Sequence, residues 1–195
     1  MSIFTEQEFR NIAIQKAGHR GLGGVVNETR TFSKSTSSTS IFLSHSHHDK
    51  AKIEQAKLFF ENLGISIYVD WADQTMPERT DGVTAKKIKN QIITLNDKFI
   101  LLATNNAVSS KWCNWEVGIA DTYKLPKDKI AILPLADNNR HWIGNEYLQI
   151  YPSIEFESGN NRNKNGYIIP KGYYVLYPSI DSSRIYENLE TWLKK

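Results

Sequence analysis

The chain alternates between short runs of consecutive apolar residues and longer stretches in which apolar residues recur every three or four positions. The short runs, rich in β-branched and aromatic residues, predict strands at residues 41–43, 65–69, 98–103, 129–135 and 173–177. The longer stretches predict helices at residues 49–63, 83–95, 110–123 and 182–194. In the helix at 83–95 the buried positions would be Val83, Ile88, Ile92 and Leu95. In the last helix they would be Ile185, Leu189, Trp192 and Leu193.

This alternation is typical of an α/β fold in which helices cover both faces of a parallel sheet. Uninterrupted apolar strands fit such a sheet because both of their faces would be buried. In open parallel sheets, ligands bind beyond the carboxyl ends of the strands, where the strand order reverses. We therefore expect a site at the loops that follow Leu43, Val69 and Ala103, and at the helix over residues 110–123.

The N-terminal part of the chain differs from the rest. Residues 5–17 have helical spacing and are followed by closely spaced glycines and then by a Ser/Thr-rich run that ends at Ser40. That composition is typical of a linker. We expect residues 1–38 to form a short helix and a linker, and residues 39–195 to form the main domain. Within it, the polar region 137–170 is not placed by its pattern.

Composition narrows the classes of function. The 195-residue chain has a formal net charge of +3 and scattered basic residues, which argues against nucleic-acid binding. Cys113 is the single cysteine, so no intrachain disulfide forms and no oxidising compartment is implied. No apolar stretch reaches the length of a membrane span, and the first residues lack the pattern of a secretory signal. We expect a soluble cytoplasmic protein that binds neither membranes nor nucleic acids.

The loop after the first predicted strand, at residues 44–49, is rich in hydroxyl and imidazole groups. Its three histidines could suggest a metal site, but a metal needs converging ligands and the chain has no second histidine cluster. We therefore expect no metal. At this sheet edge such groups suit contacts with a ribose or a carbonyl, and the candidate substrate contacts are Ser44, His45, Ser46 and Asp49. A compatible alternative is that Ser46 or Asp49 caps the following helix.

The helix at 110–123 carries a tryptophan and a carboxylate four residues apart, which places Trp112 and Glu116 on one face. A tryptophan can stack on a base or a pyridinium ring, and Trp112 and Trp115 are the candidates for such a contact with the substrate. A carboxylate beside it can accept hydrogen bonds from ribose hydroxyls and stabilise positive charge. The alternative is that Trp112 and Trp115 pack in the core and that Glu116 lies on the helix surface. Spacing alone favours this packed helix.

The segment after the second predicted strand, residues 70–73, is acidic and aromatic. It is either a strand end with solvated carboxylates or, through Trp71 and Asp73, a second wall of the same crevice. No glycine-rich phosphate loop follows any strand, and no G-x-S-x-G nucleophile elbow is present. Kinases, NTPases, classical dehydrogenases and α/β-hydrolases are therefore disfavoured.

Taken in order, these motifs resemble a bacterial TIR (Toll/interleukin-1 receptor) domain. The corresponding segments are the first strand and its loop at residues 40–49, the second strand at 65–70, the third strand at 99–104 with the helix start at 109–116, and the fourth strand at 130–135. The resemblance covers about residues 40–136, and the chain is similar to the stand-alone TIR NADases of Thoeris-like anti-phage defence systems.

The resemblance implies a flavodoxin-like three-layer fold with a five-stranded parallel sheet. It also implies that NAD⁺ is a substrate, not a cofactor, and is cleaved at its nicotinamide–ribose bond with Glu116 as the catalytic residue. Nicotinamide leaves as a neutral amide, so one carboxylate can suffice where ordinary glycosidases use two. The product would be ADP-ribose, a cyclic ADP-ribose isomer or a conjugate. Its formation would send a signal or deplete NAD⁺ during antiviral defence.

The same resemblance implies partners and leaves alternatives open. Family members often complete their active sites by self-association, here through the loop region 71–82, and a separate effector protein can sense the product. One alternative is a non-catalytic TIR adaptor that acts through TIR–TIR assembly. Another is an enzyme similar to nucleoside deoxyribosyltransferases, which have a related topology and cleave the same kind of bond.

Overall fold

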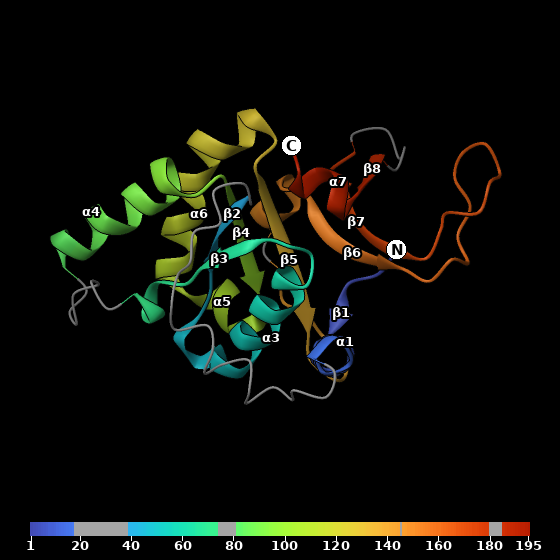
Figure 1. Ribbon diagram of the computed structural model, residues 1–195, viewed down its shortest axis with the longest axis horizontal. Coiled ribbons are helices and arrows are strands. Elements are labelled where there is room, and N and C mark those ends of the chain that lie inside the picture. The colour runs from blue at the N-terminus through green and yellow to red at the C-terminus, as the bar shows by residue number, and fades with distance from the viewer. Residues whose placement is uncertain (18–38, 74–80, 145, 180–184) are drawn as a thin grey trace.

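The computed structural model describes residues 1–17, 39–73, 81–144, 146–179 and 185–195. One sheet runs through them (Figure 1), and five of its strands are parallel neighbours in the order β3-β2-β4-β5-β6. Their bounds are Ser40–Ser44 for β2, Ser66–Tyr68 for β3, Lys98–Ala103 for β4, Ile130–Ala136 for β5 and Ser153–Glu157 for β6. The direction of winding reverses between β2 and β4, which places the switch point there. The predicted flavodoxin-like α/β fold is confirmed.

The fifth parallel strand is not the one that the sequence pattern indicated. β6 lies within the unplaced region 137–170, where Ile154 and Phe156 alternate with polar residues. The strand predicted at 173–177 is β7 (Gly172–Tyr177), which runs antiparallel to β6. β8 (Ile185–Asn188) then pairs antiparallel with β7. No helix lies between β6 and β7, so the chain turns back as a hairpin, which pairs strands antiparallel.

Helices cover both faces of the sheet (Figure 1). One face is covered by α1 (Glu6–Ala17), α3 (Lys50–Glu61) and α7 (Leu189–Leu193), which share a core with Ile41 and Leu43 of β2. The other face is covered by α4 (Gly82–Asn90), the π-helical turn η4 (Gln91–Leu95), α5 (Asn105–Ser109) and α6 (Lys111–Lys124), which share a core with Phe42. Successive strand residues point to opposite faces, so Ser44 lies on the same face as Phe42.

Two predicted helices differ from the structure in their buried faces. In α4 and η4, Ile88 and Ile92 are buried as predicted, but Val83 and Leu95 are 58% and 46% exposed. At the C-terminus, α7 buries Leu189, Trp192 and Leu193 as predicted. Ile185, however, is exposed and lies in β8, because β7 offers its edge for strand pairing just before the helix begins.

The N-terminal segment packs into the main domain. The predicted helix is α1, and β1 (Phe4–Thr5) pairs parallel with the end of β5. Phe4 and Phe9 are buried in the core cluster that α3 shares with the sheet. The N-terminal helix is therefore built into the fold. The predicted linker falls on residues 18–38, outside the described residues.

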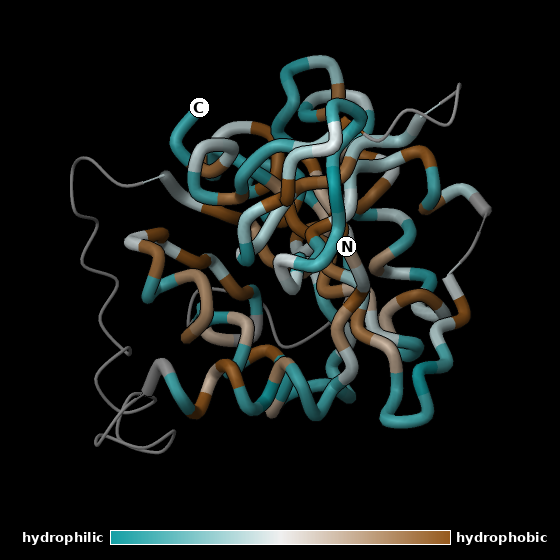
Figure 2. The backbone as a smooth tube through the Cα atoms, turned by 90° about the vertical axis from the view of Figure 1, so that its right-hand side faces the viewer, coloured by the Kyte–Doolittle hydropathy of each residue, from teal (hydrophilic) through white to brown (hydrophobic). Residues whose placement is uncertain are grey.

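The core consists of two apolar clusters, one on each side of the sheet. Stretches of hydrophobic residues lie mainly in the interior, and stretches of hydrophilic residues lie mainly in the outer loops (Figure 2). None of the helices within the described ranges combines the length and the apolar character that a membrane span requires.

Candidate functional site

A buried carboxyl group lies where β2 ends against α6. Ser110 caps this helix by accepting a hydrogen bond from the backbone N–H of Cys113 at 3.3 Å, and Glu116 follows in the second turn. Ser44 Oγ donates to Glu116 Oε2 at 2.5 Å, and Glu116 is only 2% exposed. The interpretation of Glu116 as a surface residue is therefore wrong. The structure brings Ser44 and Glu116 together at the sheet edge where the sequence predicted a site.

The surroundings of Glu116 disfavour its charged form. Burial raises the pKa of Glu116 to about 8, because a carboxylate loses its hydration there. The hydrogen bond from Ser44 opposes the rise in pKa, the negative charge of Asp70 adds to it, and a hydrogen bond from the Trp112 side chain opposes it. The charged carboxylate is therefore under-compensated, and a cation placed next to it would stabilise it strongly.

A histidine and a second carboxylate lie beside this pair. His45 Nδ1 is 2.8 Å from the carbonyl oxygen of Leu43. A carbonyl only accepts, so Nδ1 must be the donor. His45 Nε2 is 3.3 Å from Asp70 Oδ1 and has no hydrogen-bond partner in the described part of the chain. Burial lowers the pKa of His45, although the charge of Asp70 opposes this, so the buried position favours the neutral ring.

The single cysteine supports the site without acting as a nucleophile. Cys113 Sγ donates to the carbonyl oxygen of His45 at 3.1 Å, which ties α6 to the loop after β2. Burial raises the pKa of Cys113 to about 11, so it remains a thiol at neutral pH. Cys113 thereby holds the His45 backbone against the helix that carries Glu116.

Two indole rings form an aromatic pair on α6. The ring centroids of Trp112 and Trp115 are 4.7 Å apart at an interplanar angle of 31°, and both residues are half-buried. Lys89 Nζ of α4 lies 5.6 Å from the centroid of the Trp115 ring. The pair packs against the α6-side core, as the alternative interpretation held, and it remains partly exposed beside Glu116.

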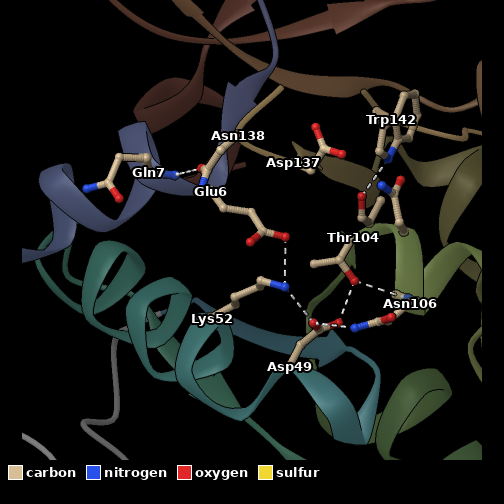
Figure 3. Close-up of polar contacts among 12 residues, drawn as sticks. Glu6, Gln7, Asp49, Lys52, Thr104, Asn106, Asp137, Asn138 and Trp142 are labelled. Carbon is tan, nitrogen blue, oxygen red and sulfur yellow. Dashed lines mark hydrogen bonds and ion pairs between the residues drawn. The ribbon is translucent and has the colours of Figure 1, made fainter. Parts of the chain in front are cut away.

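Asp49 lies in a separate network at the switch point between β2 and β4 (Figure 3). Its carboxylate accepts from Thr104 Oγ1 at 2.5 Å, from Asn106 Nδ2 at 2.9 Å and from Lys52 Nζ at 2.8 Å. Lys52 Nζ is also 2.8 Å from Glu6 Oε1 of α1. Asp49 is 2% exposed, and its oxygens are engaged by three donors. It cross-links the loops after β2 and β4, and we do not propose it as a substrate contact.

Of the two residues predicted as possible helix caps in this loop, Ser46 makes a capping hydrogen bond and Asp49 does not. Ser46 accepts a hydrogen bond from the backbone N–H of His48 at 3.4 Å and caps the 3-10 helix η2 (His47–Asp49). Asp49 makes no side-chain capping bond to α3. Ser46 is buried in the free protein. Its role as a substrate contact stays a prediction.

The segment after β3 contributes differently from what the sequence indicated. Asp73 Oδ2 accepts from the Tyr68 hydroxyl at 2.8 Å, and burial together with this bond raises the pKa of Tyr68. Asp70, which the pattern did not single out from its neighbours, is the residue that lies against His45. The Trp71 side chain and residues 74–80 of the 71–82 loop lie outside what the structure describes.

The donor types at the site do not suggest a bound metal. Within the described ranges, no group of three or more His, Cys, Asp or Glu side chains converges in a way that could hold an ion. The polar groups here instead come as a hydroxyl, two carboxyls and an imidazole beside an aromatic pair. This arrangement suits an organic ligand that carries positive charge and hydroxyl groups.

Comparison with known proteins agrees with this geometry. A family model described as a TIR domain matches residues 41–167, which run from β2 past β6 and include Ser44, His45, Asp70 and Glu116. The chain belongs to the TIR domain family. This TIR domain is 30% identical over 165 residues to a probable 3' cyclic ADP-D-ribose synthase, ThsB', of Bacillus cereus (strain MSX-D12). The alignment covers 79% of this chain and 83% of the relative.

Proposed function

We propose that this TIR domain cleaves NAD⁺ at the nicotinamide–ribose bond, with Glu116 as the catalytic carboxylate. The observation that carries the proposal is the buried Glu116–Ser44 pair, at the sheet edge where open α/β folds bind ligands. The Bacillus cereus relative, a probable 3' cyclic ADP-D-ribose synthase, supports the same substrate.

The chemistry of this bond suits an under-compensated carboxyl group. NAD⁺ carries its positive charge on the pyridinium ring, and as the C1'–N bond breaks, the electron pair leaves with neutral nicotinamide. Positive charge then develops at C1' of the ribose. Burial raises the pKa of Glu116 to about 8, and the approach of this cation would stabilise its charged form. In a site with little water, the carboxylate stabilises the developing cation more than it could in solution.

The remaining polar and aromatic groups would hold the substrate. Trp112 and Trp115 offer a stacking surface beside Glu116, and Ser44 orients the carboxylate through its hydroxyl. We infer that Ser46 contacts the substrate as well, and that Trp71 and Asp73 shape the mouth of the site. Each of these roles is a proposal about binding, while Glu116 alone is assigned to bond cleavage.

We further propose that the product is a cyclic ADP-ribose isomer that serves as a signal in anti-phage defence. The relative's name, which describes a cyclic product, supports cyclisation over plain hydrolysis. A separate effector protein in the cytoplasm would sense this product, and self-association through the 71–82 loop region would complete the active site.

The direct test is the release of nicotinamide from NAD⁺, followed by chromatography, with mass spectrometry of the second product. Glu116→Gln should reduce release by about 100-fold or more. The matched control is Glu61→Gln in α3, because partial burial also raises the pKa of Glu61 but this residue lies far from the site in the fold. Unchanged activity in Glu116→Gln would refute the catalytic assignment. If the wild type turned over no NAD⁺ under conditions in which it self-associates, the proposal that it is an enzyme would be refuted and a non-catalytic TIR adaptor would be favoured.

A further inference from the structure

The contact between His45 and Asp70 lacks one proton. His45 Nδ1 donates to the Leu43 carbonyl, so in the neutral ring Nε2 carries only a lone pair. That lone pair faces Asp70 Oδ1 at 3.3 Å, and no hydrogen bond joins them. Two acceptors thus face each other, one on the buried His45 and one on the half-buried Asp70. A single added proton would turn this contact into a charge-assisted hydrogen bond.

The structure places this pair at the border of the proposed reaction site. His45 follows Ser44, the residue that donates to Glu116, and its carbonyl oxygen accepts from Cys113, one turn before Glu116 on α6. The charge of Asp70 also contributes to the raised pKa of Glu116. The side chain of Asp70 is 14% exposed, whereas that of His45 is 3% exposed. Asp70 is therefore the outer member of the pair and His45 the inner one.

We propose that the Asp70–His45 pair accepts the proton of the hydroxyl group that attacks the ribose after nicotinamide has left. This inference rests on the proposed cleavage of NAD⁺. Asp70 would act as the catalytic base that meets the hydroxyl. His45 would act as a positioning residue that shares the proton through Nε2 and keeps its orientation through the Leu43 carbonyl.

The step balances in atoms and charge. The C1'–N bond breaks first, its electron pair goes to nicotinamide, and C1' becomes cationic. A lone pair on the attacking hydroxyl oxygen then forms the new C1'–O bond, and the proton on that oxygen passes to Asp70 Oδ1. His45 Nε2 hydrogen-bonds to that proton. The proton returns to solvent when the product leaves, and no oxidant, reductant or metal takes part.

A built-in acceptor matters because the neighbouring groups cannot easily replace it. Ser44 and the Trp112 side chain already donate to Glu116, whose carboxylate is needed to face the cation. The Cys113 thiol donates to the His45 carbonyl and cannot accept the proton at neutral pH, because burial raises its pKa to about 11. Asp49 is held by three donors at the switch point.

The test uses two kinds of nucleophile that differ only in whether they must lose a proton. Water and ribose hydroxyls must lose one, whereas a free pyridine base added to the assay attacks through its nitrogen lone pair and loses none. The full chain is incubated with NAD⁺ and a pyridine base, and the ratio of hydroxyl-capture products to base-exchange product is measured. Effects on folding, on substrate binding and on C1'–N cleavage cancel in this ratio.

The variants are Asp70→Asn, whose amide cannot accept the proton, and His45→Asn, whose amide can still donate to the Leu43 carbonyl but lacks Nε2. We expect the ratio to fall by roughly 10- to 100-fold in Asp70→Asn, and by a smaller factor in His45→Asn. His48→Asn is the control, because His48 is exposed and lies outside the pair. A ratio that stays unchanged in Asp70→Asn, including the case in which both product classes fall equally, would overturn the inference without refuting the proposed cleavage of NAD⁺. Absence of cleavage by the wild type would instead refute the proposed function itself.

Discussion

Two buried carboxyl groups at the same sheet edge have opposite surroundings. Asp49 and Glu116 are each 2% exposed. Asp49 accepts from an ammonium, a hydroxyl and an amide, which come from Lys52, Thr104 and Asn106. Glu116 accepts only from the neutral side chains of Ser44 and Trp112 among the described residues.

The difference separates a carboxylate that stabilises the fold from one that is prepared for a ligand. Pairing with a cation and full hydrogen bonding offset the desolvation cost of a buried charge, and removing that charge leaves its partners unpaired. A buried carboxyl group with few donors lowers stability when it is charged, and the missing compensation can come from a bound cation. The comparison therefore predicts opposite effects of substitution on stability.

Asp49→Ala should produce the largest change in stability. It leaves the Lys52 ammonium, Thr104 and Asn106 without their shared acceptor, so we expect the free energy of unfolding to fall by about 3 kcal/mol. Urea unfolding followed by tryptophan fluorescence measures this loss. Glu8→Gln is the control, because the Glu8–Arg140 ion pair is solvent-exposed and should contribute less than about 1 kcal/mol. Equal losses in the two variants would contradict the structural role of Asp49.

Glu116→Gln should instead stabilise the protein relative to the wild type, and increasingly so as the pH rises from 4.5 to about 8. The folded-state pKa near 8 lies above the ordinary value of 4.5, so the native state holds this proton more tightly than the unfolded chain does. The associated stability is complete below pH 4.5 and is lost as the pH rises through 8.

The wild type should therefore lose a few kcal/mol relative to Glu116→Gln between about pH 5 and about pH 9, since one pKa unit corresponds to about 1.4 kcal/mol. Parallel urea titrations of both proteins at the two pH values measure the difference, and contributions from other groups cancel. If the difference in the free energy of unfolding between the two proteins stayed constant across this range, burial would not raise the pKa of Glu116.

Ser44→Ala should have an intermediate effect, on catalysis. Its hydroxyl donates to Glu116 at 2.5 Å and lowers the pKa of that carboxyl group, so its loss should raise the pKa further. We expect kcat/KM for NAD⁺ to fall about tenfold at neutral pH and its acidic limb to move to higher pH. Ser109→Ala, in which an exposed hydroxyl is removed, is the control. A fall in kcat/KM without a shifted pH profile would assign Ser44 to substrate binding instead.

Glu6→Gln should have the smallest effect. It removes the second acceptor of Lys52 but leaves Asp49 with all three of its donors. The free energy of unfolding should change by less than about 1 kcal/mol, and NAD⁺ turnover should not change. A loss of turnover at unchanged stability would mean that α1 controls the site, which the comparison of the two carboxyl groups does not predict.

Local patterns predicted the parallel core of the sheet, because each of its apolar strands is a run of consecutive apolar residues. The start of α6 was predictable for a similar reason, because its cap, Ser110, directly precedes the helix. They did not predict β6, in which apolar and polar residues alternate inside a polar region, or the docking of α1, which depends on contacts with distant strands. The positions of Ser44 and Glu116 followed from the rule that ligands bind at strand ends.

The partners of the site residues could not be predicted in the same way. Thr104 meets Asp49 across 55 positions, and Ser44 meets Glu116 across 72. Which carboxyl group receives a cationic partner depends on where Lys52 points after folding, and no spacing within residues 44–49 carries that information. For the same reason, sequence alone ranked Asp73 above Asp70.

The most direct test is an NMR titration of the Glu116 carboxyl carbon in protein with ¹³C-labelled glutamate, with the signal assigned by its loss in Glu116→Gln. We expect an apparent pKa of about 8 in the free protein and a lower pKa when an uncleavable cationic analogue of NAD⁺ is bound. A pKa near 4.5 in the free protein, or one that the analogue leaves unchanged, would contradict the proposed role of Glu116.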